Sequence, residues 1–284
     1  MNPYQVNGIG YFVRQQYNPE RDCGRPILFI HGYPFDSSLW EPVFPFIPDS
    51  YRLIAPDLRG LGKTPLPESA AEESAAEEAV TMENFADDLA VLLDAMDVKE
   101  PLTLCGLSMG GYIAMRFAAK YPDRLAGMIL SGTKTAADTA QIISNRQKQA
   151  AGLRSGTLTL KDVADLMLPQ LLSPKTFSEK PKVAETVRTM IETNNPLGAA
   201  AAAAGMALRK DTADVVRNLT VPVQTFGGSD DKYVPPAEMN ALAKKAKSGL
   251  FTEFLLSGHL PPMEQPETFA NAVLLFVDSL FQAG

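Results

Sequence analysis

The chain alternates between short apolar runs and longer segments in which apolar residues recur at helical spacing. Short runs bounded by polar residues are typical of buried strands. Such runs are found at 27–30, 53–55, 102–105, 128–130, 221–226 and 251–256. Helical periodicity predicts an amphipathic helix from Thr81, placed to cap it, to Met96, another over 111–120, and a third near the C-terminus around Phe269 and Phe276. This alternation predicts an α/β fold with a doubly wound, mostly parallel sheet covered by helices on both faces.

Two regions depart from the alternation. Residues 65–80 are rich in Ala and Glu without an apolar stripe, which predicts an exposed loop or a short solvated helix. Residues 134–212 read as helix punctuated by prolines at 169, 174, 181 and 196. An insertion after the strand at 128–130 would lie near the carboxyl edge of the sheet, where open α/β sheets hold their ligands. We therefore expect an α/β core made of residues 1–133 and 213–284, and a helical cap, or lid, made of residues 134–212.

Composition and charge narrow the class of partner. The 284 residues include 26 Lys and Arg against 33 Asp and Glu, a net charge of −7 that would repel nucleic acid and anionic membranes. No apolar run is long enough to span a bilayer, and the first residues do not resemble a signal peptide. With only two cysteines, Cys23 and Cys105, a disulfide framework is not expected. We expect a cytoplasmic protein that binds neither nucleic acid nor membranes.

The segment Gly106-Leu107-Ser108-Met109-Gly110 follows an apolar run and precedes a predicted helix. A G-x-S-x-G sequence in this context is typical of a sharp strand-to-helix turn that exposes a nucleophilic serine hydroxyl, and small flanking residues permit its strained backbone. The alternative is a glycine-rich turn in which the serine only caps the helix. The strand and helix around the motif favour Ser108 as a nucleophile.

A serine needs a base, normally a histidine, and the chain has two. His31 begins a glycine-containing loop after the run at 27–30, whereas His259 follows the run at 251–256. A histidine in the last loop can reach over the nucleophile, while one in the early loop suits a structural role, holding that loop by hydrogen bonds. We assign the base to His259.

The third member should be a carboxylate that orients the imidazole and stabilises its cationic form. Asp230 and Asp231 follow the run at 221–226, and Asp231 has the spacing to Val234-Pro235 that is usual for this acid. Asp230 is the alternative, and both could instead cap the next helix. The predicted catalytic residues are therefore Ser108, Asp231 and His259, in that chain order.

A tetrahedral intermediate also needs hydrogen-bond donors for its negative oxygen. The backbone N–H groups of Tyr33, in the loop after His31, and of Met109, directly after Ser108, are the two that this arrangement would supply. They form the predicted oxyanion hole. The substrate-binding side chains cannot be placed from the sequence.

Nucleotide, metal and cofactor sites are disfavoured. Residues 57–64 lie one residue away from a phosphate-binding G-x-x-x-x-G-K-T loop, but Asp57 stands where the first glycine should be and no helix follows. Neither a G-x-G-x-x-G motif nor a zinc pattern is present. No metal and no cofactor are expected.

The chain resembles the α/β-hydrolase fold family over nearly its whole length. Besides the serine motif, the resemblance is carried by HGYPFDSSLW, PDLRGLGKT, GSDDKYVPP and SGHLPPMEQPETF, in the family's order. It implies an eight-stranded sheet with the cap inserted after strand 6, a structural turn at 57–62, and scaffold roles for Pro235 and Glu264. Within the family, HGYPFDSSLW and CGLSMGGYIAMRFAAKYPDR are similar to the enol-lactonase-like and the cofactor-free perhydrolase (haloperoxidase-like) branches.

The function that follows is a serine hydrolase that cleaves carboxylic esters or lactones through an acyl-enzyme. Perhydrolase activity on the same triad is one alternative, and a non-catalytic binding protein on this fold is a second. The Met, Leu and Ala content of residues 134–212 suggests a small-molecule substrate with an apolar acyl or aryl group more than a charged one. A monomer and a homodimer are both compatible with the sequence.

Overall fold

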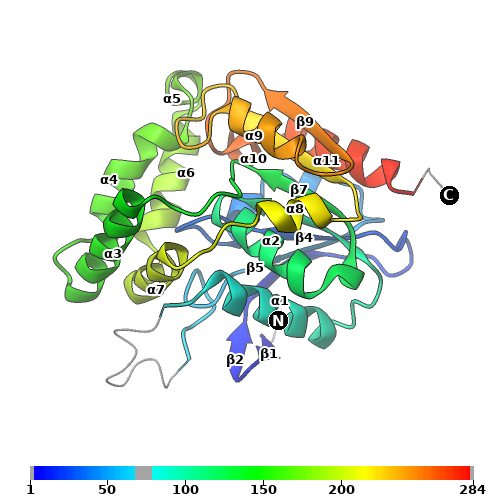
Figure 1. Ribbon diagram of the computed structural model, residues 1–284, viewed down its shortest axis with the longest axis horizontal. Coiled ribbons are helices and arrows are strands. Elements are labelled where there is room, and N and C mark those ends of the chain that lie inside the picture. The colour runs from blue at the N-terminus through cyan, green and yellow to red at the C-terminus, as the bar shows by residue number, and fades with distance from the viewer. Residues whose placement is uncertain (1–2, 68–78, 282–284) are drawn as a thin grey trace.

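The central feature of the fold is a seven-stranded, mostly parallel sheet (Figure 1). The computed structural model describes residues 3–67 and 79–281. Along the sheet the strand order is β3-β5-β4-β6-β7-β8-β9, and only β3 runs antiparallel to its neighbour. The strands are β3 (Val13–Gln16), β4 (Pro26–Ile30), β5 (Arg52–Pro56), β6 (Leu102–Leu107), β7 (Leu125–Ser131), β8 (Val223–Gly228) and β9 (Gly249–Phe254). The predicted mostly parallel sheet is confirmed.

The expected count of eight strands is wrong for the described residues, because the first two strands do not join the main sheet. β1 (Tyr4–Val6) and β2 (Ile9–Tyr11) pair with each other as a separate antiparallel hairpin. Asn7 and Gly8 have positive φ angles of 50° and 80°, the backbone conformation of a tight two-residue turn. The helical insertion consequently follows the fifth strand of the main sheet, β7, and not a sixth.

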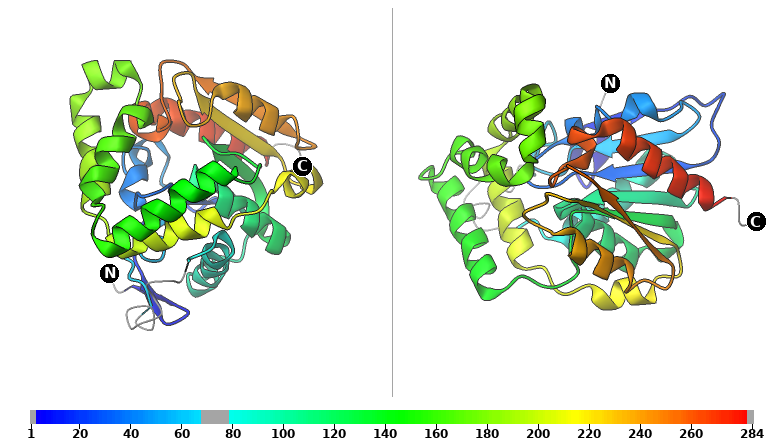
Figure 2. Two further views of the ribbon diagram at one scale, coloured as in Figure 1. Left: turned by 60° about the vertical axis from the view of Figure 1, so that its left-hand side comes forward. Right: turned by 90° about the horizontal axis from the view of Figure 1, so that it is seen from above.

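Helices cover both faces of the sheet, as predicted (Figure 2). On one face lie α1 (Met82–Ala95), α2 (Met109–Lys120), α8 (Ala213–Asn218) and α9 (Pro236–Ala243). On the other lie α11 (Pro266–Ser279) and the short 3-10 helices η1 (Ser37–Trp40) and η2 (Phe44–Phe46). Phe269 of α11 packs edge-on against Phe226 of β8, with ring centroids 5.3 Å apart, and also contacts Trp40. Two short helices, η4 (Pro122–Arg124) and α10 (Pro261–Glu264), complete the core.

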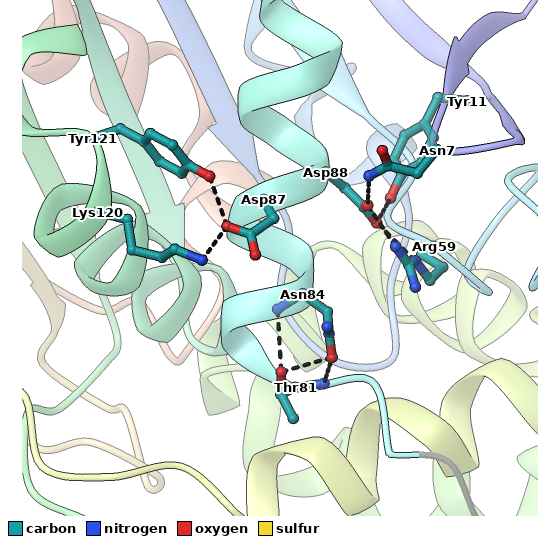
Figure 3. Close-up of polar contacts among 9 residues, drawn as sticks. All are labelled: Asn7, Tyr11, Arg59, Thr81, Asn84, Asp87, Asp88, Lys120 and Tyr121. Atoms are coloured by element: carbon teal, nitrogen blue, oxygen red, sulfur yellow. Dashed lines mark hydrogen bonds and ion pairs between the residues drawn. The ribbon is translucent and has the colours of Figure 1, made fainter.

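Helix α1 begins where the sequence predicts. The Thr81 hydroxyl accepts the Asn84 backbone N–H at 3.1 Å and completes a capping box. On the buried side of the same helix, Asp88 accepts hydrogen bonds from the Tyr11 hydroxyl at 2.5 Å and from Arg59 Nε at 2.7 Å (Figure 3). This carboxylate therefore ties the β1–β2 hairpin and the loop after β5 to α1.

Residues 140–207, between β7 and α8, form a group of helices at one end of the sheet (Figures 1 and 2). They are α3 (Ala140–Ser155), α4 (Leu160–Leu171), α5 (Pro174–Glu179), α6 (Pro181–Glu192) and α7 (Pro196–Ala207). Prolines occupy the first position of α5, α6 and α7, where the missing N–H costs no hydrogen bond, whereas Pro169 lies inside α4. A Cβ on Gly198 of α7 would lie 1.6 Å from the Gly60 carbonyl oxygen, so this helix packs directly on the turn at 57–62.

Three further expectations concern the Ala- and Glu-rich segment, the two cysteines and membrane-spanning helices. Most of the segment predicted as an exposed loop or solvated helix, residues 68–78, lies outside the described residues. Cys23 is exposed and Cys105 is buried, and neither forms a disulfide in the described part of the chain. None of the helices of the described residues has the length and apolar character needed to cross a bilayer.

Candidate active site

Ser108 stands at the turn from β6 to α2 in a backbone conformation that few residues other than glycine adopt, with φ of 55° and ψ of −114°. Its neighbours leave no room for side chains. A Cβ on Gly106 would lie 2.4 Å from the Gly110 carbonyl oxygen, and a Cβ on Gly110 would lie 2.0 Å from that of Ile30. The Ser108 amide donates to the Ser131 carbonyl at 2.8 Å, which fixes the turn to the end of β7. The local geometry is that of a half-buried, strained serine at a helix N-terminus.

His259 lies in the loop after β9 and is 3% exposed. Its Nδ1 is 2.8 Å from Asp231 Oδ2. Because an ionised carboxylate only accepts, Nδ1 carries the proton of this bond and Nε2 is left as the basic nitrogen. The other carboxylate oxygen, Oδ1, accepts the backbone N–H groups of Tyr233 at 2.8 Å and Val234 at 3.0 Å. The imidazole is therefore bonded to Asp231, whereas the alternative acid, Asp230, makes its side-chain contact with Ser229.

The histidine and the serine converge on one cavity, which both line. Gly132 follows Ser131, the residue bonded to the Ser108 amide, and a Cβ on Gly132 would lie 2.9 Å from the His259 ring carbon Cε1. The Ser108 hydroxyl makes no hydrogen bond to any of the described residues, 3–67 and 79–281. The hydrogen bond between a nucleophilic hydroxyl and its base is often long in enzymes without bound substrate and shortens in the complex.

The predicted oxyanion donors lie beside Ser108. A Cβ on Gly32 would come within 3.2 Å of the Ser108 Cβ, so the loop that continues into Tyr33 runs against the serine. Met109 is the first residue of α2, and its N–H belongs to the helix N-terminus, where negative charge is favoured. In the described part of the chain, neither the Tyr33 nor the Met109 amide is bonded to another oxygen of the protein. Both are thus available to a ligand held at Ser108.

His31 makes the hydrogen bonds of a structural residue. The buried imidazole accepts the Leu58 backbone N–H through Nε2 at 3.1 Å and contacts the Gly32 carbonyl through Nδ1 at 2.9 Å. One accepting and one donating nitrogen is the pattern of the neutral ring. Burial lowers the pKa of His31 below its ordinary value of 6.5. The loop-holding role that the sequence favours for His31 agrees with these contacts.

The segment at 57–64 is a turn and not a phosphate loop. Buried Asp57 accepts the Ser37 amide at 2.7 Å and the Lys63 amide at 2.8 Å, so its two oxygens hold two loops together. Its carboxylate occupies the space above Gly62, where a Cβ would lie 2.4 Å from Asp57 Oδ2. Within the loop, the Lys63 amide is therefore engaged by Asp57, and the Gly62 amide donates to Asn194 Oδ1 at 3.0 Å, so neither is free to hold a phosphate.

Glu264, at the end of α10, links the His259 loop to the helices at the end of the sheet. Its Oε1 accepts from the Gly258 amide at 2.7 Å, and its Oε2 accepts from the Ser173 amide at 2.8 Å. The His259 amide in turn donates to the Leu171 carbonyl at 2.7 Å. The position of the imidazole thus depends on backbone contacts with α4 and the start of α5.

The cavity has a volume of about 770 Å³ and lies between the core and helices α3 and α4. Its wall is partly apolar, as the sequence suggests; the apolar side chains are those of Ile142, Leu158, Val163, Leu166, Met167, Leu171, Met206 and Val234. The wall also carries the positively charged side chains of Lys134, Arg146, Lys148 and Lys232. The apolar acyl or aryl group suggested for the substrate stays a prediction, and these four side chains add positive charge to the wall that the Met, Leu and Ala content of residues 134–212 did not indicate.

Sequence reasoning missed the polar part of the cavity. Tyr112 of α2 and Arg146 of α3 line it, and behind them Asp138 is bonded to Arg146 at 2.7 Å and to Arg209 at 2.7 Å. The residues come from helices distant in sequence, and no motif or spacing marks them. Within the described residues, no group of three or more histidine, cysteine, aspartate or glutamate side chains is placed to hold a metal ion.

The chain is similar in sequence and in structure to known hydrolases. A sequence model described as the alpha/beta hydrolase fold matches residues 25–266. The solved structure of a thermophilic esterase from Thermogutta terrifontis, with malate bound, is 36% identical, covers 99% of this chain and 98% of its own, and superposes with a TM-score of 0.88. The 3-oxoadipate enol-lactonase 2 of Acinetobacter baylyi is 23% identical over 92% of each chain. A bromoperoxidase structure from Bacillus anthracis, 19% identical with a TM-score of 0.80 and covering 98% of this chain and 100% of its own, shares the fold.

Proposed function

The chain belongs to the α/β-hydrolase fold family, and from that premise we propose that it is a serine hydrolase of carboxylic esters or lactones that acts through an acyl-enzyme. The esterase and lactonase names of its relatives support an enzyme of the hydrolase type. One observation carries the finer proposal: a serine in a strained turn and a histidine bonded to a buried aspartate open onto the same cavity. That combination is the one that activates a hydroxyl for acyl transfer.

In the proposed reaction, Ser108 Oγ attacks the carbonyl carbon while His259 Nε2 takes the hydroxyl proton. The carbonyl oxygen becomes an anion held by the backbone N–H groups of Tyr33 and Met109. Asp231 stabilises the imidazolium that forms. When the tetrahedral intermediate collapses, the bond to the alcohol oxygen breaks and His259 returns the proton to that oxygen. Water, deprotonated by the same nitrogen, then attacks the acyl carbon. The bond from that carbon to Ser108 Oγ breaks, His259 returns the proton to Oγ, and the acid is released.

We further propose that helices α3 to α7 act as a cap over this site, within the cap region 134–212, on a core formed by residues 1–133 and 213–284. Support comes from the cavity, whose wall includes residues of α3 and α4 as well as Ser108 and His259. Such a cap would select the acyl and alcohol groups that reach the serine.

A fluorophosphonate probe tests the proposal because it reacts only with an activated serine. We expect the wild-type protein to be labelled and Ser108→Ala to remain unlabelled. Hydrolysis of p-nitrophenyl esters of increasing chain length, of lactones, and of esters in the presence of hydrogen peroxide would then separate esterase, lactonase and perhydrolase activity. Wild-type protein that is folded but resists the probe would contradict the serine-hydrolase mechanism and favour a binding protein on this fold.

A further inference from the structure

The wall of the cavity is positively charged although the whole chain has a net charge of −7. Lys134, Arg146, Lys148 and Lys232 line it, and no aspartate or glutamate is among the described residues of the wall. Positive charge gathered in a concave site raises the local concentration of anions. The occupant of the cavity is thus expected to carry negative charge.

Arg146 is held in a fixed position at this wall. Its Nε donates to Asp138 Oδ2 at 2.7 Å and its Nη1 contacts Met206 Sδ at 3.0 Å, and the side chain is only 20% exposed. Asp138 Oδ1 accepts from Arg209 at 2.7 Å, and the Arg209 guanidinium stacks on the ring of Tyr112 at 4.0 Å. Burial alone would raise the pKa of Asp138, but its bonds to the two arginines outweigh burial and hold that pKa below its usual value. One carboxylate therefore faces two guanidinium groups, and one positive charge is left uncompensated beside the cavity.

A second observation concerns a hydrogen-bond donor on another residue that lines the same cavity. The Tyr33 hydroxyl is buried in a side chain that is 7% exposed, and it has no hydrogen-bond partner among the described residues. Tyr33 lines the cavity, and the positive charge of Arg146 partly opposes the effect of burial on the pKa of its hydroxyl. Burial raises the pKa of the Tyr33 hydroxyl, which keeps its proton available for donation. Buried hydroxyl groups are nearly always bonded, so an unpartnered one on a residue that lines the cavity indicates a ligand atom that accepts its proton.

We propose that the Arg146 guanidinium and the Tyr33 hydroxyl form a carboxylate-binding subsite, and that the substrates are esters or lactones with a second, free carboxylate close to the carbonyl that Ser108 attacks. A planar guanidinium fork matches a carboxylate, and the tyrosine hydroxyl supplies a further donor. The free carboxylate would lie close to the reacting carbonyl oxygen because both contact Tyr33. The oxygen would accept from the backbone amide of Tyr33, and the carboxylate from its hydroxyl, one side-chain length away. This inference rests on the proposed serine-hydrolase function and names its substrate class.

Paired substrates test the subsite. 4-Nitrophenyl hydrogen glutarate carries the free carboxylate on the acyl side, and 4-nitrophenyl methyl glutarate is the same acyl group with that carboxylate masked. 4-Acetoxybenzoate and its methyl ester form the equivalent pair on the alcohol side. In each pair the readout is the ratio of kcat/KM for the acid to that for its neutral partner, after subtraction of spontaneous hydrolysis. We expect a ratio of about ten or more in at least one pair, decreasing at high salt.

Variants then locate the interaction. Arg146→Gln should lower that ratio by about tenfold, mainly through KM, because it removes the charge but not the nucleophile. Tyr33→Phe should lower it severalfold, since the backbone amide remains. The matched control is Arg188→Gln, which removes one positive charge from α6, where Arg188 is bonded to Asp165 at 2.5 Å, away from the cavity wall. This control should leave the ratio unchanged.

Failure of the subsite and failure of the proposed function are distinguishable. Ratios near one in both pairs, or a ratio that Arg146→Gln leaves unchanged in folded protein, would overturn the subsite while ester turnover itself sustains the hydrolase. Calorimetry of glutarate with Ser108→Ala needs no turnover; we expect binding that weakens about tenfold on adding Tyr33→Phe or Arg146→Gln. Glutarate that does not bind, or binds equally to all these variants, would count against the subsite. If Arg146→Gln does not fold, the Tyr33→Phe comparison decides alone.

Discussion

Glu264 Oε1 accepts the backbone N–H of Gly258, the residue before the proposed catalytic base, at 2.7 Å. The same carboxylate accepts the Ser257 hydroxyl at 3.2 Å and, through Oε2, the Ser173 amide and the Thr176 hydroxyl at 2.8 Å and 2.7 Å. A buried acceptor with these donors joins the loop that carries the base to the start of α5. The scaffold role that the resemblance implies for Glu264 is thereby a contact between the core and the proposed cap.

Replacing this carboxylate should loosen the loop. Glu264→Gln keeps the shape but turns one oxygen into an NH₂ group facing N–H and O–H donors, so we expect a loss of about 2–4 kcal/mol in the free energy of unfolding and a lower kcat. Urea denaturation and ester hydrolysis measure the two effects. Glu267→Gln, at an exposed position of α11, is the matched control and should change stability by less than about 0.5 kcal/mol. Equal stability of both variants would show that the buried contacts of Glu264 contribute little.

The backbone strain at Ser108 predicts that a glycine at this position gives a more stable protein than an alanine, although neither is active. Its φ of 55° and ψ of −114° suit glycine. Ser108→Gly and Ser108→Ala both remove the hydroxyl, but only the glycine relieves the strain, so Ser108→Gly should be the more stable of the two by about 1 kcal/mol. Denaturant unfolding of the pair measures this difference, and both variants should fail to react with fluorophosphonate. An alanine variant as stable as the glycine variant would indicate that the turn stores no strain.

The sequence predicted the sheet, the amphipathic helix α1 and the residues around Ser108 because these depend on local patterns. Apolar runs mark buried strands, and the glycines beside Ser108 are required by the clash of any Cβ with backbone oxygens. The strand count was wrong because β1 and β2 pair with each other around Asn7-Gly8, a dipeptide typical of hairpin turns, and do not join the main sheet. Arg146 could not be found because its role depends on how α3 packs over the core, and a single sequence does not contain that tertiary contact.

The choice between two neighbouring aspartates gives a direct test of the proposed triad. Asp231 is bonded to the imidazole of His259, so Asp231→Asn should favour the wrong tautomer and lower kcat by about 10³- to 10⁴-fold. Asp230→Asn is the matched control, because that carboxylate contacts only Ser229 among the side chains of the described residues. We expect it to keep nearly wild-type turnover. The reverse result in a p-nitrophenyl ester assay would transfer the role to Asp230.

The second histidine predicts a pH dependence of stability separate from that of catalysis. Burial lowers the pKa of His31, although the Gly32 carbonyl and the charges of Asp57 and Asp36 oppose this effect. The unfolded chain, with an ordinary pKa of about 6.5, therefore binds the proton more readily than the folded protein. The stabilisation is present above about pH 6.5 and is lost as the pH falls toward the folded pKa, by at most about 1.4 kcal/mol per pH unit.

In His259→Gln, His31 is the only remaining histidine of the two in the chain, so its ring-proton resonance can be followed by NMR without ambiguity. We expect the neutral form to persist below pH 6.5 and the free energy of unfolding to decrease over the same range. A titration midpoint at or above 6.5 would mean that the imidazole is not held neutral by burial and by the N–H of Leu58, and that the loop at Gly32 depends on other contacts.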